Sequence, residues 1–273
     1  MKCLLLVFLF SVFCNGQELY SFIENYEKGN TVKYKEDSIW SFEVAGNLTE
    51  SGMTNTKTIK CLGFKDNFLL LEETMVDLVA TKKTLGKMSA DHTTNQLIGV
   101  PYTLYVDTLL GTIDHIETEF KEFEELINSQ VRGVGNMDNR IFPFGKNAVD
   151  IKIKDSWTVP ADSVEFFMGD GGSPNYMVFT AKFTLDKVKN KKGVNIAYIS
   201  AIYEITANLF FIQDSKIFEG NIIGEIKNKI RFDLTNNNMI LSKSTGSMKW
   251  KFVLEGERFT AMMDLSNKKK RVK

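Results

Sequence analysis

Apolar and polar residues alternate along most of the segment from Phe218 to Leu265. Ile226 and Ile230 fall on one face of this alternation, and Lys227 and Lys229 fall on the other. A period of two residues is typical of a strand that has one face buried and one face in water. The pattern therefore predicts that this segment consists of long strands packed by one face only.

The residues that interrupt the alternation are those that tight turns need. Asn236-Asn237-Asn238 and Glu255-Gly256 divide the segment into three strands, because Asn and Gly tolerate the left-handed backbone. Elsewhere, turns are predicted at Glu50-Ser51-Gly52 and Lys65-Asp66-Asn67, and a polar loop at Leu85–Gly99. Similar patterns predict further strands at Thr31–Lys35, Ile39–Leu48, Thr54–Phe64, Asn67–Thr81, Tyr102–Val106, Ile113–Ile116, Val178–Val188 and Val194–Leu209.

Two of the turns share a spacing. Asp107 and Asp233 each close a strand, and Gly111 and Asn237 follow four residues later at the position suited to the left-handed region. The match fits convergent turn chemistry, and it also fits an internal duplication of the sheet. The sequence leaves both interpretations open.

Helical spacing is found at Glu119–Ser129, where apolar residues form one stripe and acidic residues occupy the first turns. A helix of this length is stable only if its stripe packs on another element. The sequence therefore predicts an amphipathic helix that covers a sheet, with a second short helix at Gln17–Asn25. The stripe consists of Phe120, Phe123, Leu126 and Ile127.

The strands are predicted to be about 12–16 residues long, against a usual length of about 5–6. Sheets of such strands twist and coil, and glycines inside them allow sharp bends. Gly220, Gly224 and Gly246 interrupt strand patterns in this way. The predicted fold class is mainly β: a long curved antiparallel sheet, half-barrel or barrel-like, with one amphipathic helix packed on it.

Residues 1–16 have the pattern of a cleavable secretory signal peptide. Lys2 precedes the apolar run Leu4–Phe13, and small residues stand just before Gln17. The alternative is a lipoprotein anchored through Cys14, although Phe13 is too large for the usual lipobox. The remaining chain is divided into a β half at 17–118, a helix and loop connection at 119–150, a second β half at 151–267 and a basic tail at 268–273.

Composition is that of an ordinary globular protein, 43% hydrophobic and 25% charged. Lys plus Arg and Asp plus Glu each number 34, so the net charge indicates neither nucleic acid nor a membrane surface as a partner. The basic tail is predicted to be disordered and solubilising, with a nucleic-acid or lipid-headgroup patch as the alternative. Cys61 is the cysteine left after the signal peptide, so no internal disulfide is expected.

No motif indicates catalysis or a cofactor. His92 and His115 are the two histidines, and Asp114 and Glu117 flank the second. Without an i, i+4 pair or a cysteine this set is weak evidence for a metal, so we predict no metal, no cofactor and no catalytic residue. A hydrolase whose site the sequence hides is the weakest alternative, since no Gly-x-Ser-x-Gly segment occurs.

The box Lys154-Asp155-Ser156-Trp157, the strand with Gly220 and Gly224 and the Phe232-Asp233 turn resemble a family of uncharacterised exported bacterial proteins, many of them lipoproteins. The resemblance covers 154–263 and implies no activity. It implies a sheet architecture similar to that of periplasmic lipoprotein carriers, in which a curved antiparallel sheet holds acyl chains against helices. This sequence departs from the carriers in having one clear helix and a poor lipobox.

These patterns together predict an exported, non-enzymatic protein, periplasmic, outer-envelope-associated or secreted. Its partner is a hydrophobic small molecule or lipid on the concave face, with no nucleic acid and no membrane span after signal cleavage. The alternatives are a structural or envelope protein-interaction module with a packed core, and an outer-membrane barrel, whose hairpin order the 119–150 segment would break. The predicted ligand-lining residues are Phe183, Ile226, Ile230, Phe232, Trp250 and Phe252 of the sheet, with Phe120 and Phe123 of the helix.

Overall fold

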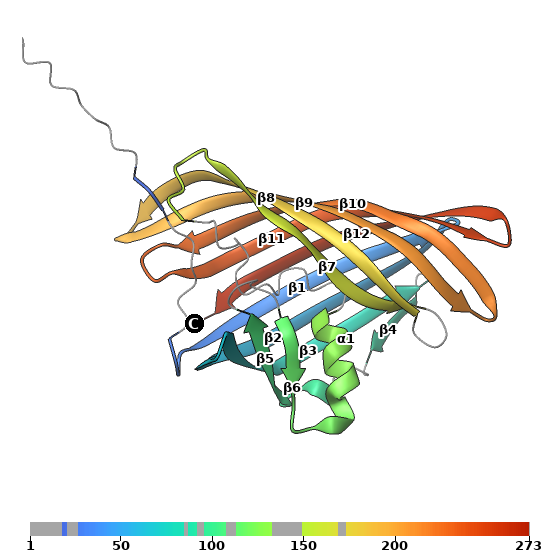
Figure 1. The fold of residues 1–273 in the computed structure, drawn as a ribbon, viewed down its shortest axis with the longest axis horizontal. Helices are drawn as coiled ribbons and strands as arrows, with labels where there is room; N and C mark the ends of the chain where they lie inside the picture. The colour runs from blue at the N-terminus through green and yellow to red at the C-terminus, as the bar shows by residue number, and fades with distance from the viewer. Residues whose placement is uncertain are drawn as a thin grey trace, which may run out of the picture.

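The computed structural model describes residues 18–20, 27–84, 87–91, 96–107, 113–132, 149–168 and 173–272. The predicted signal peptide and most of the predicted helix at Gln17–Asn25 lie outside these residues. All strands belong to one 12-stranded sheet (Figure 1). In chain order they are β1 (Thr31–Val44), β2 (Asn47–Lys65), β3 (Phe68–Thr84), β4 (Lys87–Asp91), β5 (Pro101–Asp107), β6 (Ile113–Glu117), β7 (Ser156–Met168), β8 (Ser173–Lys191), β9 (Val194–Gln213), β10 (Lys216–Asp233), β11 (Asn238–Leu254) and β12 (Glu257–Val272).

The sheet is an antiparallel meander whose two halves join at its centre. Its strand order is β6-β5-β3-β2-β1-β12-β11-β10-β9-β8-β7, with β4 paired to β3 outside this path. The first long strand therefore lies beside the last, in a register that runs from Lys33 opposite Val272 to Val44 opposite Ala261. Strands β6 and β7 form the two edges, so the sheet is open.

The predicted three-stranded segment from Phe218 to Leu265 is confirmed as β10, β11 and β12, paired antiparallel. The turn before β11 includes Asn237 with a φ of 47°, in the left-handed region that the sequence predicted. Gly111, its counterpart in the proposed duplication, lies outside the described residues. The duplication therefore stays a prediction.

Several boundaries in the first half were predicted wrongly. The turn assigned to Glu50-Ser51-Gly52 lies inside β2, and the chain turns instead at Ala45-Gly46, whose φ values are 49° and 80°. Glycine adopts a positive φ without strain, so Gly46 suits this turn. Strand β2 then continues through the polar residues Glu50 and Ser51. The predicted polar loop contains β4, which pairs with β3 through backbone bonds that do not depend on apolar side chains.

The basic tail is not disordered over the residues that the structure describes. Strand β12 continues to Val272, and residues 268–272 pair with β1. Lys269 is buried on one face, while Lys268 and Lys270 are exposed on the other. Paired strands on both sides supply hydrogen-bond partners that a run of lysines cannot reveal in the sequence.

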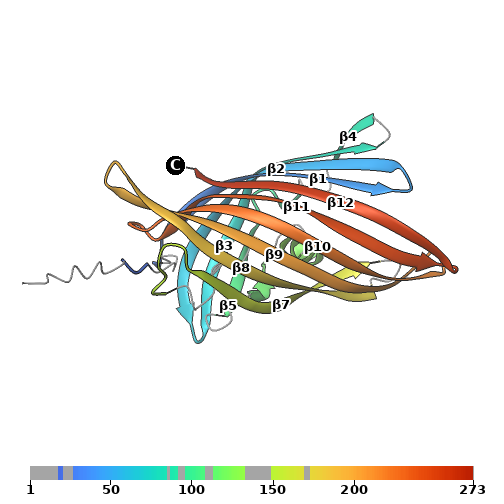
Figure 2. The ribbon, with the colours of Figure 1, turned by 90° about the horizontal axis from the view of Figure 1, so that it is seen from above.

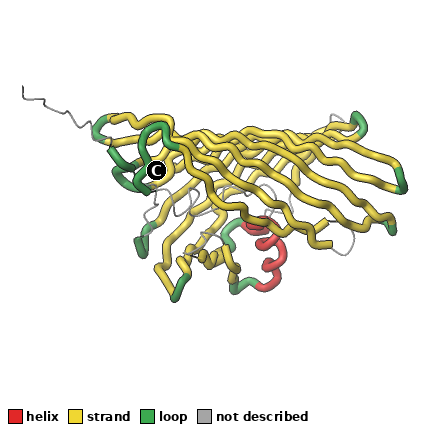
Figure 3. The backbone as a smooth tube through the Cα atoms, turned by 45° about the horizontal axis from the view of Figure 1, so that its top comes forward, coloured by secondary structure: helices red, strands yellow, loops and turns green. Residues whose placement is uncertain are grey.

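The helix begins later than predicted. A 3₁₀ turn at Lys121–Phe123 precedes α1 (Glu124–Arg132), so Phe120 lies before the helical segment rather than on its stripe. Ile127 is 1% exposed and belongs to one apolar cluster with side chains of β2, β3, β5 and β6, and α1 contacts β7. The helix follows the edge strand β6 and reaches the opposite edge, as Figures 1 and 3 show.

The prediction of a mainly β protein with one long, curved antiparallel sheet is confirmed, and Figure 2 shows the curl of the strands from above. Two apolar clusters line the inner face of the curl. The larger lies mainly on β7–β11, and the smaller lies on β2, β3, β5, β6 and α1. No helix in the described ranges is long and apolar enough to cross a membrane.

Candidate functional site: the inner face of the sheet

The inner face is defined by the alternate residues whose side chains are buried. On β10, Ile222 is 0% exposed and Ile226 5%, whereas their neighbour Ile223 on the outer face is 57% exposed. The same alternation runs along β9, where Ile199 and Ile205 are buried. The sequence period of two therefore assigned the faces of β10 correctly.

Most of the predicted ligand-lining residues meet in the larger apolar cluster. Phe183, Ile226, Ile230 and Phe232 are members of it, and Trp250 is partly buried against it. They come from β8, β10 and β11, which the sheet order brings side by side around β9. The structure therefore assembles these side chains on one surface.

Trp157, in the Asp-Ser-Trp box, also enters this cluster. Its ring stacks on Phe183 with centroids 5.5 Å apart. Just before it, the amide of Lys152 donates to Asp155 Oδ2 at 3.0 Å, and the amide of Leu185 donates to the Asp155 carbonyl oxygen at 3.1 Å. The box thus ties the start of β7 to β8.

Phe252 belongs to an aromatic ladder that the sequence reasoning did not identify. Phe211, Phe218, Phe252 and Phe259 stand on four neighbouring strands, with successive ring centroids 4.6, 6.0 and 5.5 Å apart. Cross-strand aromatic pairs stabilise a sheet and fix its register. The predicted turn at Glu255-Gly256 places Phe252 opposite Phe259, but the other neighbours of the ladder follow only from the observed pairing of the strands.

The two helix residues are not brought to the larger cluster. Phe123 packs against the smaller cluster, and Phe120 is 38% exposed. The structure therefore does not bring these two residues together with Phe183 and Ile226. The cause is the late start of α1, which replaces the predicted first helical turn by a 3₁₀ turn.

A band of buried polar side chains crosses the inner face, and sequence reasoning missed it. Charged members are Glu36, Lys57, Glu73 and Lys269, each no more than 9% exposed. Each of these residues lies an even number of positions from a buried apolar residue of the same strand. This spacing was the signal in the sequence that could have revealed the band. We call this set the polar band; its other members are Ser38, Asn55, Tyr102, Asn228, Ser242, Ser244 and Asn267.

The centre of the polar band is an ion pair between Lys57 Nζ and Glu73 Oε1, 2.7 Å apart. The hydroxyl of Tyr102 donates to the same carboxylate oxygen. Across β1, Asn267 Nδ2 donates to Glu36 Oε1 at 2.5 Å, and the ammonium of Lys269 lies 5.1 Å from the centre of the Tyr34 ring. These contacts form two groups, one across β2, β3 and β5 and one across β1 and β12.

The shifted pKa values of Lys57 and Glu73 favour the charged form of both side chains. Burial alone would lower the pKa of Lys57, but the carboxylates of Glu73 and Glu36 raise it above its usual value. Burial alone would raise the pKa of Glu73, but Lys57 and the hydrogen bond from Tyr102 lower it. Burial, followed by the charge of Glu73, raises the pKa of Tyr102 well above its usual value.

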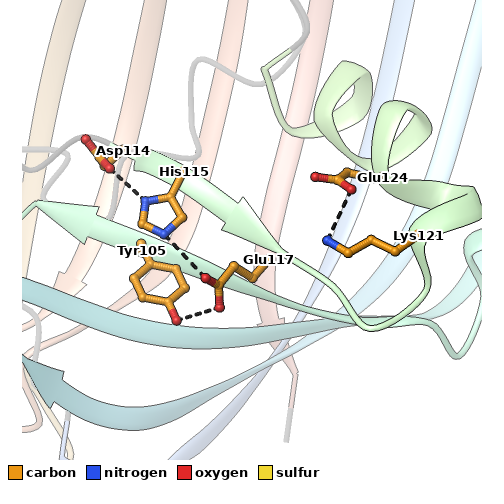
Figure 4. A network of polar contacts seen from close by, with 6 residues as sticks. All are labelled: Tyr105, Asp114, His115, Glu117, Lys121 and Glu124. Carbon is orange, nitrogen blue, oxygen red and sulfur yellow. Dashed lines mark hydrogen bonds and ion pairs between the residues drawn. The ribbon is translucent and has the colours of Figure 1, made fainter.

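The weak metal candidate lies on the exposed hairpin of β5 and β6. His115 Nδ1 lies 2.7 Å from Asp114 Oδ2, and its ring stacks on Tyr105, whose hydroxyl donates to Glu117 at 2.6 Å (Figure 4). No group of three or more potential metal ligands occurs among the described residues. His92 lies outside them. These contacts act as surface pairs that tie the hairpin together.

Comparison with known proteins finds a similar fold but no related sequence. No family model and no curated protein matches the sequence. The resemblance inferred from the Asp155-Ser156-Trp157 box therefore stays a prediction. A solved structure described as "Lipid-protein interactions in lipovitellin" matches with a TM-score of 0.50 over 91% of this chain and 26% of that chain, at 12% sequence identity.

The class that the fold defines is that of large, curved, open antiparallel sheets with one apolar face. The particular likeness is to lipovitellin, and at 12% identity it concerns the fold alone. This chain spans about a quarter of the length of that protein, since it covers 26% of it.

Proposed function

We propose that this chain is an exported, non-enzymatic protein that binds a hydrophobic ligand or lipid on the inner face of its sheet. The observation that supports this most directly is the larger apolar cluster. It contains many buried side chains of a single-layered sheet, and none of the α1 residues whose side chains the structure describes belongs to it. An extended apolar face of this kind is suited to acyl chains or a comparable apolar ligand.

Three further features support the proposal. The predicted signal peptide supports export, and the absence of a recognisable catalytic motif in the sequence supports a binding role. The fold likeness is to a protein whose solved structure is described by its lipid–protein interactions.

The first experiment is to purify the folded full-length protein from its native host and to analyse an organic extract by mass spectrometry. The proposal predicts a defined lipid in a fixed ratio to protein. Under the alternative, a structural or envelope-interaction module with a packed core, extracts of folded protein carry no lipid above the background of an unrelated secreted protein.

A matched pair of variants tests which face binds. Ile226→Trp fills the inner face, whereas Ile223→Trp adds the same ring to the outer face of the same strand. We expect the first variant to weaken binding of a fluorescent fatty-acid probe about tenfold and the second to leave it unchanged. Equal binding by both folded variants would contradict binding on the inner face.

A further inference from the structure

Asn55 on β2 is the most deeply buried side chain of the polar band, with 1% of its surface exposed. Neither Oδ1 nor Nδ2 of its carboxamide has a hydrogen-bond partner within the part of the chain that the structure describes. Buried polar groups are rarely left in this state, because an unpaired one costs stability. Asn55 therefore offers a donor and an acceptor to a bound molecule.

Asn267 on β12 repeats this feature close by. Its Nδ2 donates to Glu36, while its Oδ1 has no partner among the described residues. Glu36 stands directly opposite Asn55 in the pairing of β1 with β2. The two incompletely bonded carboxamides thus flank one carboxylate, and they present two acceptors and one donor in a small region of the inner face.

The charges around this region are balanced. Lys57 pairs with Glu73, and Lys269 stands opposite Glu36 in the pairing of β1 with β12. A bound phosphate would add a buried negative charge for which these residues leave no free cation, and an uncompensated buried charge is costly. The region therefore favours a neutral polar group over an anionic one.

We infer that the part of the polar band around Asn55 and Asn267 is a headgroup site for a neutral, hydroxyl-bearing lipid of the diacylglycerol type. This inference rests on the proposed lipid-binding function. A hydroxyl both donates and accepts, so one such group can accept from Asn55 Nδ2 and donate to a carboxamide oxygen. The hydrocarbon chains then extend over the apolar surface beside the band.

The test uses the folded full-length protein and three purified lipids, measured by displacement of a fluorescent fatty-acid probe. The lipids are dioleoylglycerol, trioleoylglycerol, which lacks the hydroxyl, and dioleoylphosphatidic acid. We expect dioleoylglycerol to bind about tenfold more tightly than the other two. Asn55→Leu should remove this preference without weakening trioleoylglycerol binding.

Two further variants make the comparison specific. Asn55→Ser keeps a donor and an acceptor and should retain part of the preference, while Asn221→Leu changes an exposed asparagine on the outer face of β10 and should retain all of it. If the wild type binds none of the three lipids, the proposed function itself is contradicted. If lipids bind but Asn55→Leu keeps the preference, or phosphatidic acid binds best, the headgroup inference alone is overturned.

A second inference rests on the outer face, where basic side chains lie in register. Lys229 stands opposite Lys243, and Lys243 stands opposite Lys268, across β10, β11 and β12. In the next row, Lys270 of β12 stands opposite Lys35 of β1. All five lysines are exposed, and like charges directly opposite one another destabilise a sheet.

The same basic surface continues to β8. Three cations surround the Tyr198 ring: Lys187 Nζ lies 5.2 Å, Lys191 Nζ 6.0 Å and Arg231 Cζ 5.6 Å from its centre. A hydrogen bond from Lys191 lowers the pKa of the Tyr198 hydroxyl. No ion pair joins Lys229, Lys243 or Lys268 to an acidic residue within the described ranges. The chain as a whole has no net charge, so this is a local concentration.

We propose that this basic outer surface binds the face of an anionic lipid bilayer. It spans six adjacent strands, or about 24 Å at 4.8 Å per strand spacing, and the sheet is one layer thick. Most of its cations are lysines, which act as point charges toward a diffuse anionic surface. Specific phosphate recognition in nucleic acids favours the planar fork of arginine.

Vesicle sedimentation tests this surface. The full-length protein should bind phosphatidylcholine vesicles that contain phosphatidylserine at least about tenfold more tightly than pure phosphatidylcholine, and high salt should abolish the difference. The triple variant Lys229→Glu, Lys243→Glu and Lys268→Glu should lose it. The control triple variant Lys65→Glu, Lys152→Glu and Lys154→Glu changes exposed lysines outside β8–β12 and β1, has the same net charge and should keep it. Equal losses in both variants, or tighter binding to DNA than to the anionic vesicles, would overturn the proposal.

Discussion

Lys57 and Glu73 occupy inward positions that apolar side chains could fill, and only 11% and 4% of these side chains are exposed. Desolvation of such a pair opposes its attraction, so the pair itself adds little net stability. Removing one partner is different, because the other charge is then left buried without compensation. The pair therefore specifies the register of β2 and β3 more than it stabilises them.

Lys57→Met should lower the free energy of unfolding by about 3–5 kcal/mol, whereas Lys57→Met combined with Glu73→Leu should recover most of that loss. Chemical denaturation followed by circular dichroism measures both. If the double variant is no more stable than the single one, the uncompensated charge is not the cause.

The pH dependence follows from the directions of the pKa shifts. Glu73 titrates below its usual 4.5, so its contribution is present above that pH and is lost as the pH falls through the lower, folded value. Lys57 titrates above its usual 10.5, so its contribution is present below that pH and is lost as the pH rises through the folded value. The acid limb of the stability curve should be shallower in the double variant than in the wild type.

At this scale the sequence predicted the faces of the strands but not the polar band. The parity of Ile226 and Ile230 is unambiguous, because a strand that is buried on one side must alternate. In a sequence, a lysine or glutamate at an inward position of a strand is interpreted as an interruption of the apolar alternation or as a solvated strand end. Only the pairing of β2 with β3 brings Lys57 and Glu73 together.

At the scale of elements, β10 and β11 approach each other unusually closely at their glycines. A Cβ on Gly246 would lie 2.4 Å from the Glu225 carbonyl oxygen, and one on Gly220 would lie 2.1 Å from the Lys251 carbonyl oxygen. The atoms in the way belong to the backbone, which cannot move aside. These glycines permit close strand approach where the sequence predicted sharp bends.

Gly246→Ala should therefore destabilise the protein by about 1–3 kcal/mol or more, as in other overpacked sites. Gly52→Ala in β2 is the matched control, because its Cβ would lie 3.3 Å from the Thr81 hydroxyl and 3.7 Å from the Ser38 carbonyl oxygen, and no positive φ is required. That change should fall within about 1 kcal/mol of the wild type. Thermal unfolding of both variants makes the comparison, and equal effects would contradict the close approach.

The elements that the sequence predicted best are those with both a strong period and strong turn residues, such as β10 and β11 on either side of residues 236–238. Ala45-Gly46 was missed because Glu50-Ser51-Gly52 has more turn-forming residues. The start of α1 was missed because Phe120 continues the helical stripe. Local preference cannot reveal which of two acceptable positions the neighbouring strands select.

At the scale of the whole molecule, the pairing of β1 with β12 joins the two halves into one sheet. Seven register pairs, from Lys33–Val272 to Ile39–Ser266, involve residues 266–272 of the chain. A tail read as solubilising is thus part of the junction on which the curvature of the sheet depends.

Deleting residues 266–273 should abolish cooperative thermal unfolding and cause aggregation, because β1 and β11 would both lose part of their pairing with β12 and expose unpaired backbone groups. Replacing Lys268 and Lys270 by Thr preserves strand formation and should leave the unfolding transition nearly unchanged. A truncated protein that unfolds like the wild type would contradict the central role of this pairing.

The central claim is that the inner face of the sheet holds an apolar ligand. Photo-crosslinking of the folded protein with a diazirine fatty acid, followed by tandem mass spectrometry of the β10 peptide, tests it most directly. We predict adducts on Ile222, Ile226 and Ile230, which are four residues apart and all lie on the inner face. Adducts on Ile223, Lys227 and Lys229, or adducts spread evenly over both faces, would contradict the claim.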